Sequence, residues 1–253
     1  MAAARPRKLE NKIAVVTGGN SGIGLATATL FREEGATVVI TASSAASYAK
    51  AKQDLGKLFE VVQVDVADLK QIDKLYEFVK SKYGKFDVLF ANAGIAKFAP
   101  TLEMDVAKFD EMYNVNVKGL YFTVVKAIPL LNAGASVILN SSIASQIGLA
   151  QGDVYASTKA AVRSFARSWT AAFPPTQVRF NVLSPGITWT PLFERTMSKE
   201  QAQGFVDQMA ASLPLKRAAQ PEEMARSALF LASTDSSYVV GFDLVVDGGQ
   251  LQV

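Results

Sequence analysis

Short, continuously apolar runs alternate with helical segments along almost the whole chain, and this alternation constrains the fold more than any other feature. The runs cover residues 13–16, 38–40, 61–64, 88–90, 137–139, 178–183 and 244–246. Strands that are apolar on both faces are typical of a parallel sheet covered by helices, joined by right-handed crossovers. We therefore predict an α/β fold of the doubly wound, Rossmann type, with seven strands in a mostly parallel sheet flanked by helices.

The chain contains no internal repeat and no linker rich in Pro, Gly or Ser. We predict a flexible tail at residues 1–8 and a single domain at 9–253, which is long enough to bury a core. Within it, 187–213 is predicted to be a hydrophobic lid over a small-molecule site, and the alternative is ordinary packing. Its large apolar residues are Trp189, Leu192, Phe193, Met197, Phe205, Met209 and Leu213.

Two absences limit the chemistry. The chain has no Cys and no His, which excludes disulfides, thiolate nucleophiles, Ser-His-Asp hydrolysis and metal sites of Cys or His. We predict no metal site, and proton transfer near neutral pH must use Tyr, Lys, Asp or Glu. A net charge of +3 offers no footprint for nucleic acid or an anionic membrane. With no targeting or membrane-spanning segment in view, we expect a cytoplasmic protein.

A glycine-rich turn joins the first apolar run to a predicted helix at 22–34. Gly18, Gly22 and Gly24 let backbone N–H groups approach a phosphate at the helix N-terminus. A bland strand–helix turn has the same composition, but the position between a strand and a helix favours nucleotide binding.

A second pattern pairs Tyr155 with Lys159. Residues four apart share a helix face, and an ammonium beside a phenol favours the phenolate. We therefore expect Lys159 to lower the pKa of Tyr155, so that the phenol can donate or accept a proton near neutral pH. The alternative is an exposed helix pair without chemistry.

The turn's spacing, Gly-x-x-x-Gly-x-Gly, resembles that of the short-chain dehydrogenase/reductase family. Further motifs of the family follow in order: Asp65, Asn92-Ala93-Gly94, Asn116, Ser142 thirteen residues before Tyr155, Pro185-Gly186 and Val246-Asp247-Gly248-Gly249. The resemblance extends over residues 9–253. It implies a nicotinamide-dependent oxidoreductase of the compact, single-domain kind, similar to bacterial carbonyl reductases and alcohol dehydrogenases.

The resemblance also implies roles for particular residues. Ser142 orients the substrate carbonyl, and Tyr155 is the general acid or base. Lys159 tunes Tyr155 and holds the nicotinamide ribose, while Asn116 positions a water that relays protons to Lys159. The implied cofactor-binding residues are Gly18, Asn20, Ser21, Gly22, Ile23, Gly24, Ser43, Ser44, Asp65, Val66, Asn92, Ala93, Gly94, Tyr155, Lys159, Pro185, Gly186, Ile187 and Thr188.

The end of the second strand bears on the choice of cofactor. NAD-preferring relatives usually carry Asp at the position of Ala42, where it repels a 2′-phosphate, and this chain has no carboxylate there. Ser43 and Ser44 can donate to a phosphate, and Asn20 can add a donor. We therefore expect NADP(H) to be preferred, with NAD(H) possible. The alternative is that both serines only cap the next helix.

We expect the substrate to be an apolar ketone or secondary alcohol, because Trp189 stands where relatives often carry an acidic residue. Two alternatives remain open. One is a 3-oxoacyl-carrier-protein reductase, against which stands the absence of Lys and Arg between Lys126 and Lys159. The other is a non-catalytic nucleotide-binding sensor or scaffold.

The resemblance also implies a homotetramer or homodimer, built on the Tyr155 helix and the C-terminal strand. The apolar stripe offered by that helix is Val162, Phe165, Ala166 and Trp169, and the alternative is that this stripe is core.

Overall fold

The computed structural model describes residues 6–174, 178–191 and 198–253. Within them seven strands form one sheet in the order β3-β2-β1-β4-β5-β6-β7, and every neighbouring pair is parallel. The strands are β1 (Ile13–Val16), β2 (Thr37–Ala42), β3 (Glu60–Gln63), β4 (Phe86–Ala91), β5 (Leu131–Asn140), β6 (Val178–Pro185) and β7 (Asp243–Val246). The helices are α1 (Gly22–Glu33), α2 (Ala45–Leu55), α3 (Leu69–Tyr83), α4 (Val106–Tyr113), α5 (Leu120–Ala127), α6 (Asp153–Ala172), α7 (Lys199–Ser212) and α8 (Pro221–Ala232). The predicted doubly wound sheet is confirmed.

Strand β5 is longer than its apolar run predicts. Its first residues include exposed Ala133 and Gly134, and its pairing with β4 shifts register between Phe86 and Val88. The apolar run at 137–139 marks only the part of β5 that is buried between β4 and β6. The start of the strand includes Leu131, which pairs with Phe86 of β4, a long-range contact that apolar periodicity does not record.

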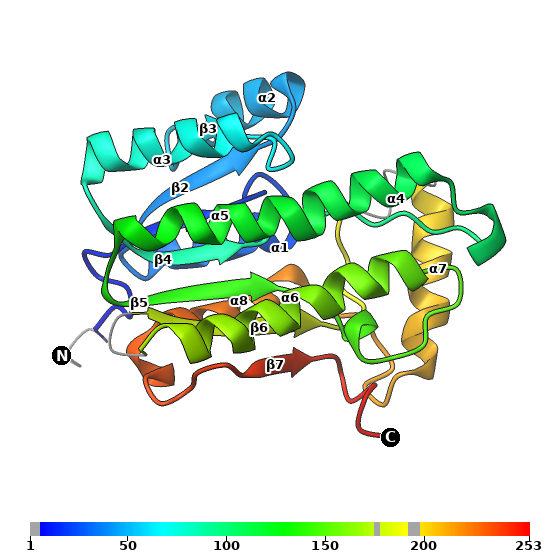
Figure 1. Ribbon diagram of the computed structural model, residues 1–253. Coiled ribbons are helices and arrows are strands. Elements are labelled where there is room, and N and C mark those ends of the chain that lie inside the picture. The colour runs from blue at the N-terminus through cyan, green and yellow to red at the C-terminus, as the bar shows by residue number, and fades with distance from the viewer. Residues whose placement is uncertain (1–5, 175–177, 192–197) are drawn as a thin grey trace.

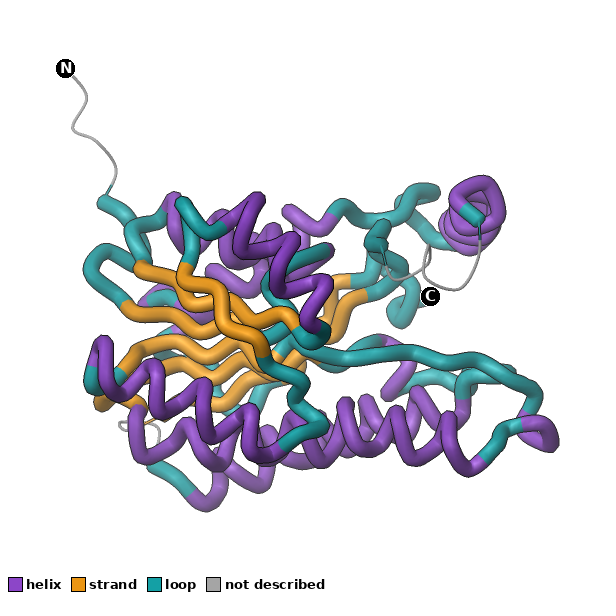
Figure 2. The backbone as a smooth tube through the Cα atoms, turned by 90° about the horizontal axis from the view of Figure 1, so that it is seen from above, coloured by secondary structure: helices purple, strands orange, loops and turns teal. Residues whose placement is uncertain are grey.

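Helices cover both faces of the sheet (Figures 1 and 2). One face packs against α3, α5 and α6, in a core that contains Leu75, Val124 and Val162. The other packs against α1, α2 and α8, with Phe31 and Met224 in its core. The strands are therefore covered on both sides, which explains why β6 is buried along its whole length.

The chain reverses its winding direction at β1, which lies between β2 and β4. In doubly wound sheets a crevice forms outside the carboxyl ends of the strands at this point. Helix α7 lies beyond that same edge of the sheet, clear of both helical layers, in yellow in Figure 1. The fold thus places the loops after β1, β4 and β5 around one crevice.

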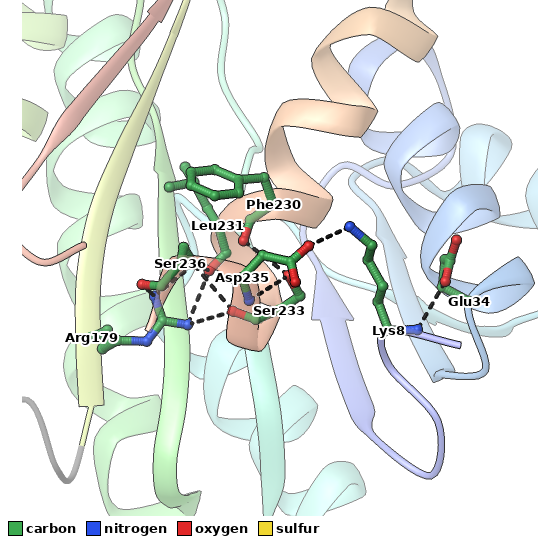
Figure 3. A network of polar contacts seen from close by, with 8 residues as sticks. All are labelled: Lys8, Glu34, Arg179, Phe230, Leu231, Ser233, Asp235 and Ser236. Carbon is green, nitrogen blue, oxygen red and sulfur yellow. Dashed lines mark hydrogen bonds and ion pairs between the residues drawn. The ribbon is translucent and has the colours of Figure 1, made fainter. Parts of the chain in front are cut away.

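The first described residues are fastened rather than loose. Lys8 donates its backbone N–H to Glu34, 2.8 Å from Oε2, and its ammonium pairs with Asp235 (Figure 3). Leu9 is buried. The prediction of a flexible tail through residue 8 is therefore wrong at Lys8, because partners from α1 and from the segment after α8 hold it.

No helix among the described ranges has both the length and the apolar character needed to cross a bilayer.

Candidate active site

The glycine-rich turn has backbone that favours glycine. Gly18 and Gly22 have φ of 62° and 53°, in the left-handed region. Gly24 lies against the turn itself, because a Cβ there would sit 2.4 Å from the Gly18 carbonyl oxygen. Ser21, which precedes α1, makes no side-chain cap, and the first turn of α1 has no acidic residue. The Ser21 side chain therefore leaves the backbone N–H groups at the start of α1 uncapped, and the first turn of α1 has no acidic side chain to repel an anion. Both conditions favour anion binding at this helix N-terminus.

Asn92, just after β4, locks this turn in place. Its Nδ2 donates to the carbonyl oxygens of Thr17 (3.0 Å) and Gly18 (3.3 Å). In return, Thr17 Oγ1 accepts from the backbone N–H groups of Asn92 and Ala93. The turn after β1 and the loop after β4 therefore form one rigid unit.

A cleft of about 320 Å³ opens beside this unit. Most of the predicted cofactor-binding residues line it: Gly18, Asn20, Ser21, Gly22, Ile23, Ser43, Asp65, Val66, Asn92, Ala93 and Gly94. The residues come from loops after four different strands. Their convergence follows from the parallel sheet, whose strands all end at one edge.

Other predicted cofactor-binding residues lie outside the cleft lining: Gly24, Ser44, Tyr155, Lys159, Pro185, Gly186, Ile187 and Thr188. The loop after β6 reaches the cleft farther along, through Thr190 and Pro191. A bridge between Thr188 and Ala219 directs this loop, and a Cβ added at Gly22 would lie 3.3 Å from Thr190 Cγ2. Thr190 thus closes over the glycine-rich turn, a contact that motif spacing does not reveal.

Sequence reasoning also missed other lining residues: Thr41, Val64, Ile95, Glu111, Val115 and Asn140. Glu111 and Val115 reach the cleft only because α4 and the segment after it pack beside the sheet. Asn140 carried a signal, since a polar residue at the end of a buried strand lies at the ligand-binding edge.

The two serines after β2 differ in their surroundings. Ser44 caps α2 in a reciprocal pair with Ser47, its Oγ accepting from Ser47 N at 3.1 Å. Ser43 is exposed and lines the cleft, whereas Ala42 is buried in the core. The capping alternative thus holds for Ser44, and Ser43 rather than residue 42 is the position that faces a ligand.

Helix α6 carries Tyr155 and Lys159 one turn apart, as predicted. The hydroxyl of Ser142, two residues beyond β5, lies close enough to the Tyr155 phenol to lower its pKa. The Lys159 ammonium donates to the Asn140 carbonyl oxygen at 2.8 Å and lies 5.7 Å from the centre of the Tyr155 ring. The predicted Ser, Tyr and Lys are therefore brought together at the end of β5.

Burial dominates the ionisation of this group. It raises the pKa of Tyr155, although the hydrogen bond from Ser142 acts in the opposite direction, and it lowers the pKa of Lys159 to about 8. We expected Lys159 to lower the pKa of Tyr155, and in this structure that expectation is wrong. The ammonium is directed at a backbone carbonyl, and desolvation of the phenolate outweighs its influence.

Asn116 lies in η2 (Asn114–Gly119), a widened π-type turn between α4 and α5. Its side chain is 1% exposed and exchanges two 2.8 Å hydrogen bonds with the backbone of Ile95. Its Nδ2 also donates to Thr158 Oγ1 at 3.1 Å. Gly94 separates Asn116 from Lys159, since a Cβ there would lie 3.2 Å from Asn116 Oδ1 and 3.5 Å from Lys159 Nζ. Asn116 thus connects the loop after β4, beside the cleft, to helix α6.

An apolar wall stands beside Tyr155. The Phe98 ring, 54% exposed, meets the Tyr155 ring edge-on at 5.9 Å. Leu149 packs next to it, because a Cβ at Gly152 would touch both Leu149 and Phe98. A hydrogen bond of 2.9 Å from Ala99 N to the Gln151 carbonyl oxygen ties the two loops.

The predicted lid is only partly visible. Trp189 lines a different, open groove against α7, with Val206 and Ala210, and does not line the cleft. Leu213 is buried, and Phe205 on α7 is exposed. Leu192, Phe193 and Met197 lie outside the described residues. The position of Trp189 therefore gives no support to the expectation, drawn from this residue, of an apolar substrate.

Comparison with known proteins identifies the family of this chain. A family model described as enoyl-(acyl carrier protein) reductase matches residues 18–250. A solved structure described as a short chain dehydrogenase/reductase family protein superposes with a TM-score of 0.84 at 40% identity, covering 97% of this chain and all of that one. This chain belongs to the short-chain dehydrogenase/reductase family. It is an oxidoreductase, and the family typically uses NAD(P)(H).

Two curated members of the family are similar over nearly their whole length. The cis-4-hydroxycyclohexanecarboxylate dehydrogenase of Sinomonas cyclohexanicum is 38% identical, with 96% of this chain and 97% of that protein covered. The 3-oxoacyl-[acyl-carrier-protein] reductase FabG of Thermotoga maritima is 34% identical, with 96% and 98% covered. The family is thus shown, while these two relatives act on different substrates.

Proposed function

We propose that this short-chain dehydrogenase/reductase interconverts an apolar ketone and a secondary alcohol, with NADP(H) as its preferred cofactor and Tyr155 as general acid and base. The observation that carries the proposal is the convergence of Ser142, Tyr155 and Lys159 at the end of β5, where Ser142 lies beside Tyr155 and Lys159 lies one turn along α6 from Tyr155. We also expect the enzyme to be cytoplasmic and to act on a small molecule.

The residues present fit a dinucleotide. The backbone of the turn at Gly18 and Gly22 exposes N–H groups to a pyrophosphate. Asp65 lines the cleft on one side of the turn, where it would hold the adenine end. Lys159 and Asn140 mark the other side, where the nicotinamide half would lie. When bound, the nicotinamide supplies or accepts the hydride.

The protein's own part in the reaction is to hold the substrate oxygen and move one proton. In the reducing direction the Ser142 hydroxyl donates to the carbonyl oxygen and fixes its place. Tyr155 Oη then gives its proton to that oxygen as the alcohol forms. In the oxidising direction Tyr155 takes the proton back. Because Ser142 lies beside Tyr155, both hydroxyls can reach one substrate oxygen.

Lys159 and Asn116 assist the loss and return of the Tyr155 proton. The Lys159 ammonium would stabilise the phenolate left behind, and it would hold the ribose hydroxyls of a bound nicotinamide cofactor. Asn116 Oδ1 faces the same glycine as Lys159 Nζ, which places it to hold a water that returns protons from solvent.

The surroundings of Tyr155 support an apolar substrate. Phe98 and Leu149 supply an aromatic and an aliphatic surface next to the hydroxyl that acts. Small-molecule sites are mostly apolar with a few placed polar groups, and Ser142 and Tyr155 are those groups here. The similarity to a dehydrogenase of a cyclic hydroxy acid supports the same reaction class.

The preference for NADP(H) rests on Ser43. Its hydroxyl lines the cleft, and no carboxylate stands beside it at the end of β2 to repel a 2′-phosphate. The N-terminus of α2 begins two residues later and adds its positive end.

A carrier-protein reductase is the second candidate, favoured by the 34% identity to FabG of Thermotoga maritima. Such an enzyme docks an acidic protein and needs basic residues beside its active site. The stretch between Lys126 and Lys159, which includes Ser142 and Tyr155, has none. A panel containing a 3-oxoacyl thioester, free and on carrier protein, separates the candidates, since only the second needs the protein.

The function is tested by following the absorbance of reduced nicotinamide with NADPH or NADH and a panel of aryl, alkyl and cyclic ketones. Tyr155→Phe should lower kcat by about 10²-fold or more, the usual contribution of a general acid. Tyr113→Phe is the matched control, because Tyr113 bonds Ser157 at 3.0 Å outside the cleft. Equal turnover by Tyr155→Phe and wild type would overturn the mechanism. Tight nucleotide binding with no turnover on any substrate would favour a sensor or scaffold.

The cofactor preference has its own test. Ser43→Asp places a carboxylate at the exposed end of β2, and we expect it to raise the KM for NADPH and to leave that for NADH unchanged or lower. A wild type that prefers NADH would contradict the preference while keeping the enzyme.

A further inference from the structure

Asn140 occupies a place between the two halves of the site. It is the last residue of β5, lines the cleft, and lies two residues before Ser142. Neither the motifs nor the family resemblance pointed to its side chain.

Asn140 makes two different hydrogen bonds. Its side-chain Nδ2 donates to Asn92 Oδ1 at 3.0 Å, and its backbone oxygen accepts from Lys159 Nζ at 2.8 Å. Asn92 in turn donates to the Gly18 carbonyl oxygen. A continuous line of contacts therefore runs from the glycine-rich turn, through Asn92 and Asn140, to Lys159, crossing β1, β4, β5 and α6.

The remaining polar atom of the side chain is unpaired. Asn140 Oδ1 is buried and has no hydrogen-bond partner among the described residues. A buried acceptor without a donor costs free energy, and such atoms gather at sites of function. The Lys159 ammonium donates to the backbone oxygen of the same residue. Asn140 therefore combines an unpaired buried acceptor on its side chain with the backbone acceptor that holds the ammonium.

The groups around Lys159 leave Asn140 as its main polar neighbour. Tyr155 faces it from α6, and Asn116 faces it from η2 across Gly94. Neither Asn116 nor Asn140 carries a charge, and the lowered pKa of Lys159 has burial as its cause. The position of the ammonium thus depends on hydrogen bonds to neutral oxygens, which hold it in place without neutralising it.

We propose that Asn140 is a positioning residue whose amide couples the glycine-rich turn to Lys159, so that the pyrophosphate site and the lysine that holds the nicotinamide ribose form one unit. The inference rests on the proposed nicotinamide-dependent function. It concerns placement only, since Asn140 transfers no proton. An Asp at this position would keep the shape but lose the donor to Asn92 and place a negative charge beside the ammonium.

Binding measurements test the coupling without turnover. By isothermal titration calorimetry, Asn140→Ala should raise the Kd for NADPH about tenfold, the loss expected for a misplaced charge-assisted contact. The Kd of this variant for adenosine 2′,5′-bisphosphate, which lacks the nicotinamide ribose, should change less than threefold. A change of roughly that size is expected when the substituted residue does not contact the ligand. Asn132→Ala is the matched control, because Asn132 lies at the opposite end of β5, on Asp87.

The isosteric Asn140→Asp supplies a second readout. A carboxylate beside Lys159 should move the pH midpoint of kcat upward relative to wild type, whereas Asn132→Asp should leave it in place. Unchanged NADPH binding in Asn140→Ala, or an unchanged pH profile in Asn140→Asp, would overturn the inference. A wild type that binds neither nucleotide would instead overturn the proposed function, so the two failures are distinguishable.

Discussion

At the scale of single residues, burial in the fold disfavours the charged form of Lys159. The side chain is 5% exposed, and burial lowers its pKa to about 8 from an ordinary value of 10.5. The charged form is thus less stable in the folded protein than in the unfolded chain. The hydrogen bond from its ammonium to the Asn140 carbonyl offsets only part of that cost.

Lys159→Met should therefore inactivate the enzyme but stabilise the fold at pH 7. Below pH 8 wild-type Lys159 is charged in both the folded and the unfolded protein. Burying that charge lowers the free energy of unfolding by about 3 kcal/mol, and the hydrogen bond restores about 1 kcal/mol of it. Between about pH 8 and 10.5 the folded lysine is neutral and the unfolded one charged, so wild-type stability rises with pH. Urea unfolding across this range should show the advantage of the variant shrinking. A variant less stable than wild type at pH 7 would contradict the argument.

Gly24 is the position in the glycine-rich turn where an added side chain would clash most severely. A Cβ there would lie 2.4 Å from Gly18 O and 2.6 Å from Asn92 Nδ2, so Gly24→Ala must open the turn. We expect loss of nucleotide binding and a destabilisation of about 2–3 kcal/mol, measured by calorimetry and thermal unfolding. Gly204→Ala, in α7 with nothing within 4 Å, is the control and should stabilise by about 0.5–1 kcal/mol. Normal nucleotide binding by Gly24→Ala would refute the close approach.

At the scale of elements, one buried arginine joins the last helix to the sheet. Arg179 on β6 is 7% exposed, and its guanidinium donates to the carbonyl oxygens of Leu231, Ser233 and Ser236 (Figure 3). These carbonyls end α8 and form the short turn η6 (Thr234–Ser236), where a cation is favoured by the helix dipole. The same segment holds Lys8 through Asp235, so the start of the chain is attached to it.

Arg179→Met should remove this cap and leave buried carbonyls without donors. We expect a loss of about 3 kcal/mol in the free energy of unfolding, measured with urea, and unchanged kcat per folded molecule at low temperature, since the cap is distant from Ser142 and Tyr155. Arg167→Met, on the exposed side of α6, should change stability by less than about 0.5 kcal/mol. Equal stability of the two variants would contradict the capping role.

At the scale of the whole molecule, the two parts of the expected association surface, the stripe on α6 and the C-terminal strand β7, differ in exposure. On α6, Val162, Ala166 and Trp169 are buried inside the monomer, so most of the stripe is core, as the alternative held. Exposed apolar side chains instead flank β7, an edge strand: Tyr238 is fully exposed and Phe242 half-exposed. We therefore keep the proposal of a homotetramer or homodimer and place its contact on the β7 side.

Light scattering should give a mass two or four times the 27.1 kDa of the chain. Replacing Tyr238 and Phe242 by Ser should lower that mass, because an apolar interface loses its aromatic anchors. Replacing Leu102 by Ser, an exposed residue on the short turn before α4, should not. A wild-type mass equal to the monomer would reject association.

The sequence alone determined the features that are local. Continuous apolar runs specify strands buried on two faces, the glycine-rich turn specifies where the proposed phosphate site lies, and a four-residue spacing places Tyr155 and Lys159 on one side of α6. Each depends on neighbours within one or two turns of chain, so periodicity and spacing record it.

Only the tertiary structure decided how those parts behave together. It buried Tyr155 so that its pKa rises, directed Ser43 rather than Ala42 into the cleft, brought Thr190 over Gly22, and placed Asn140 between Asn92 and Lys159. Burial, electric field and hydrogen-bond partners are set by which distant elements pack around a residue. That arrangement leaves no periodic trace in the residue's own stretch of chain.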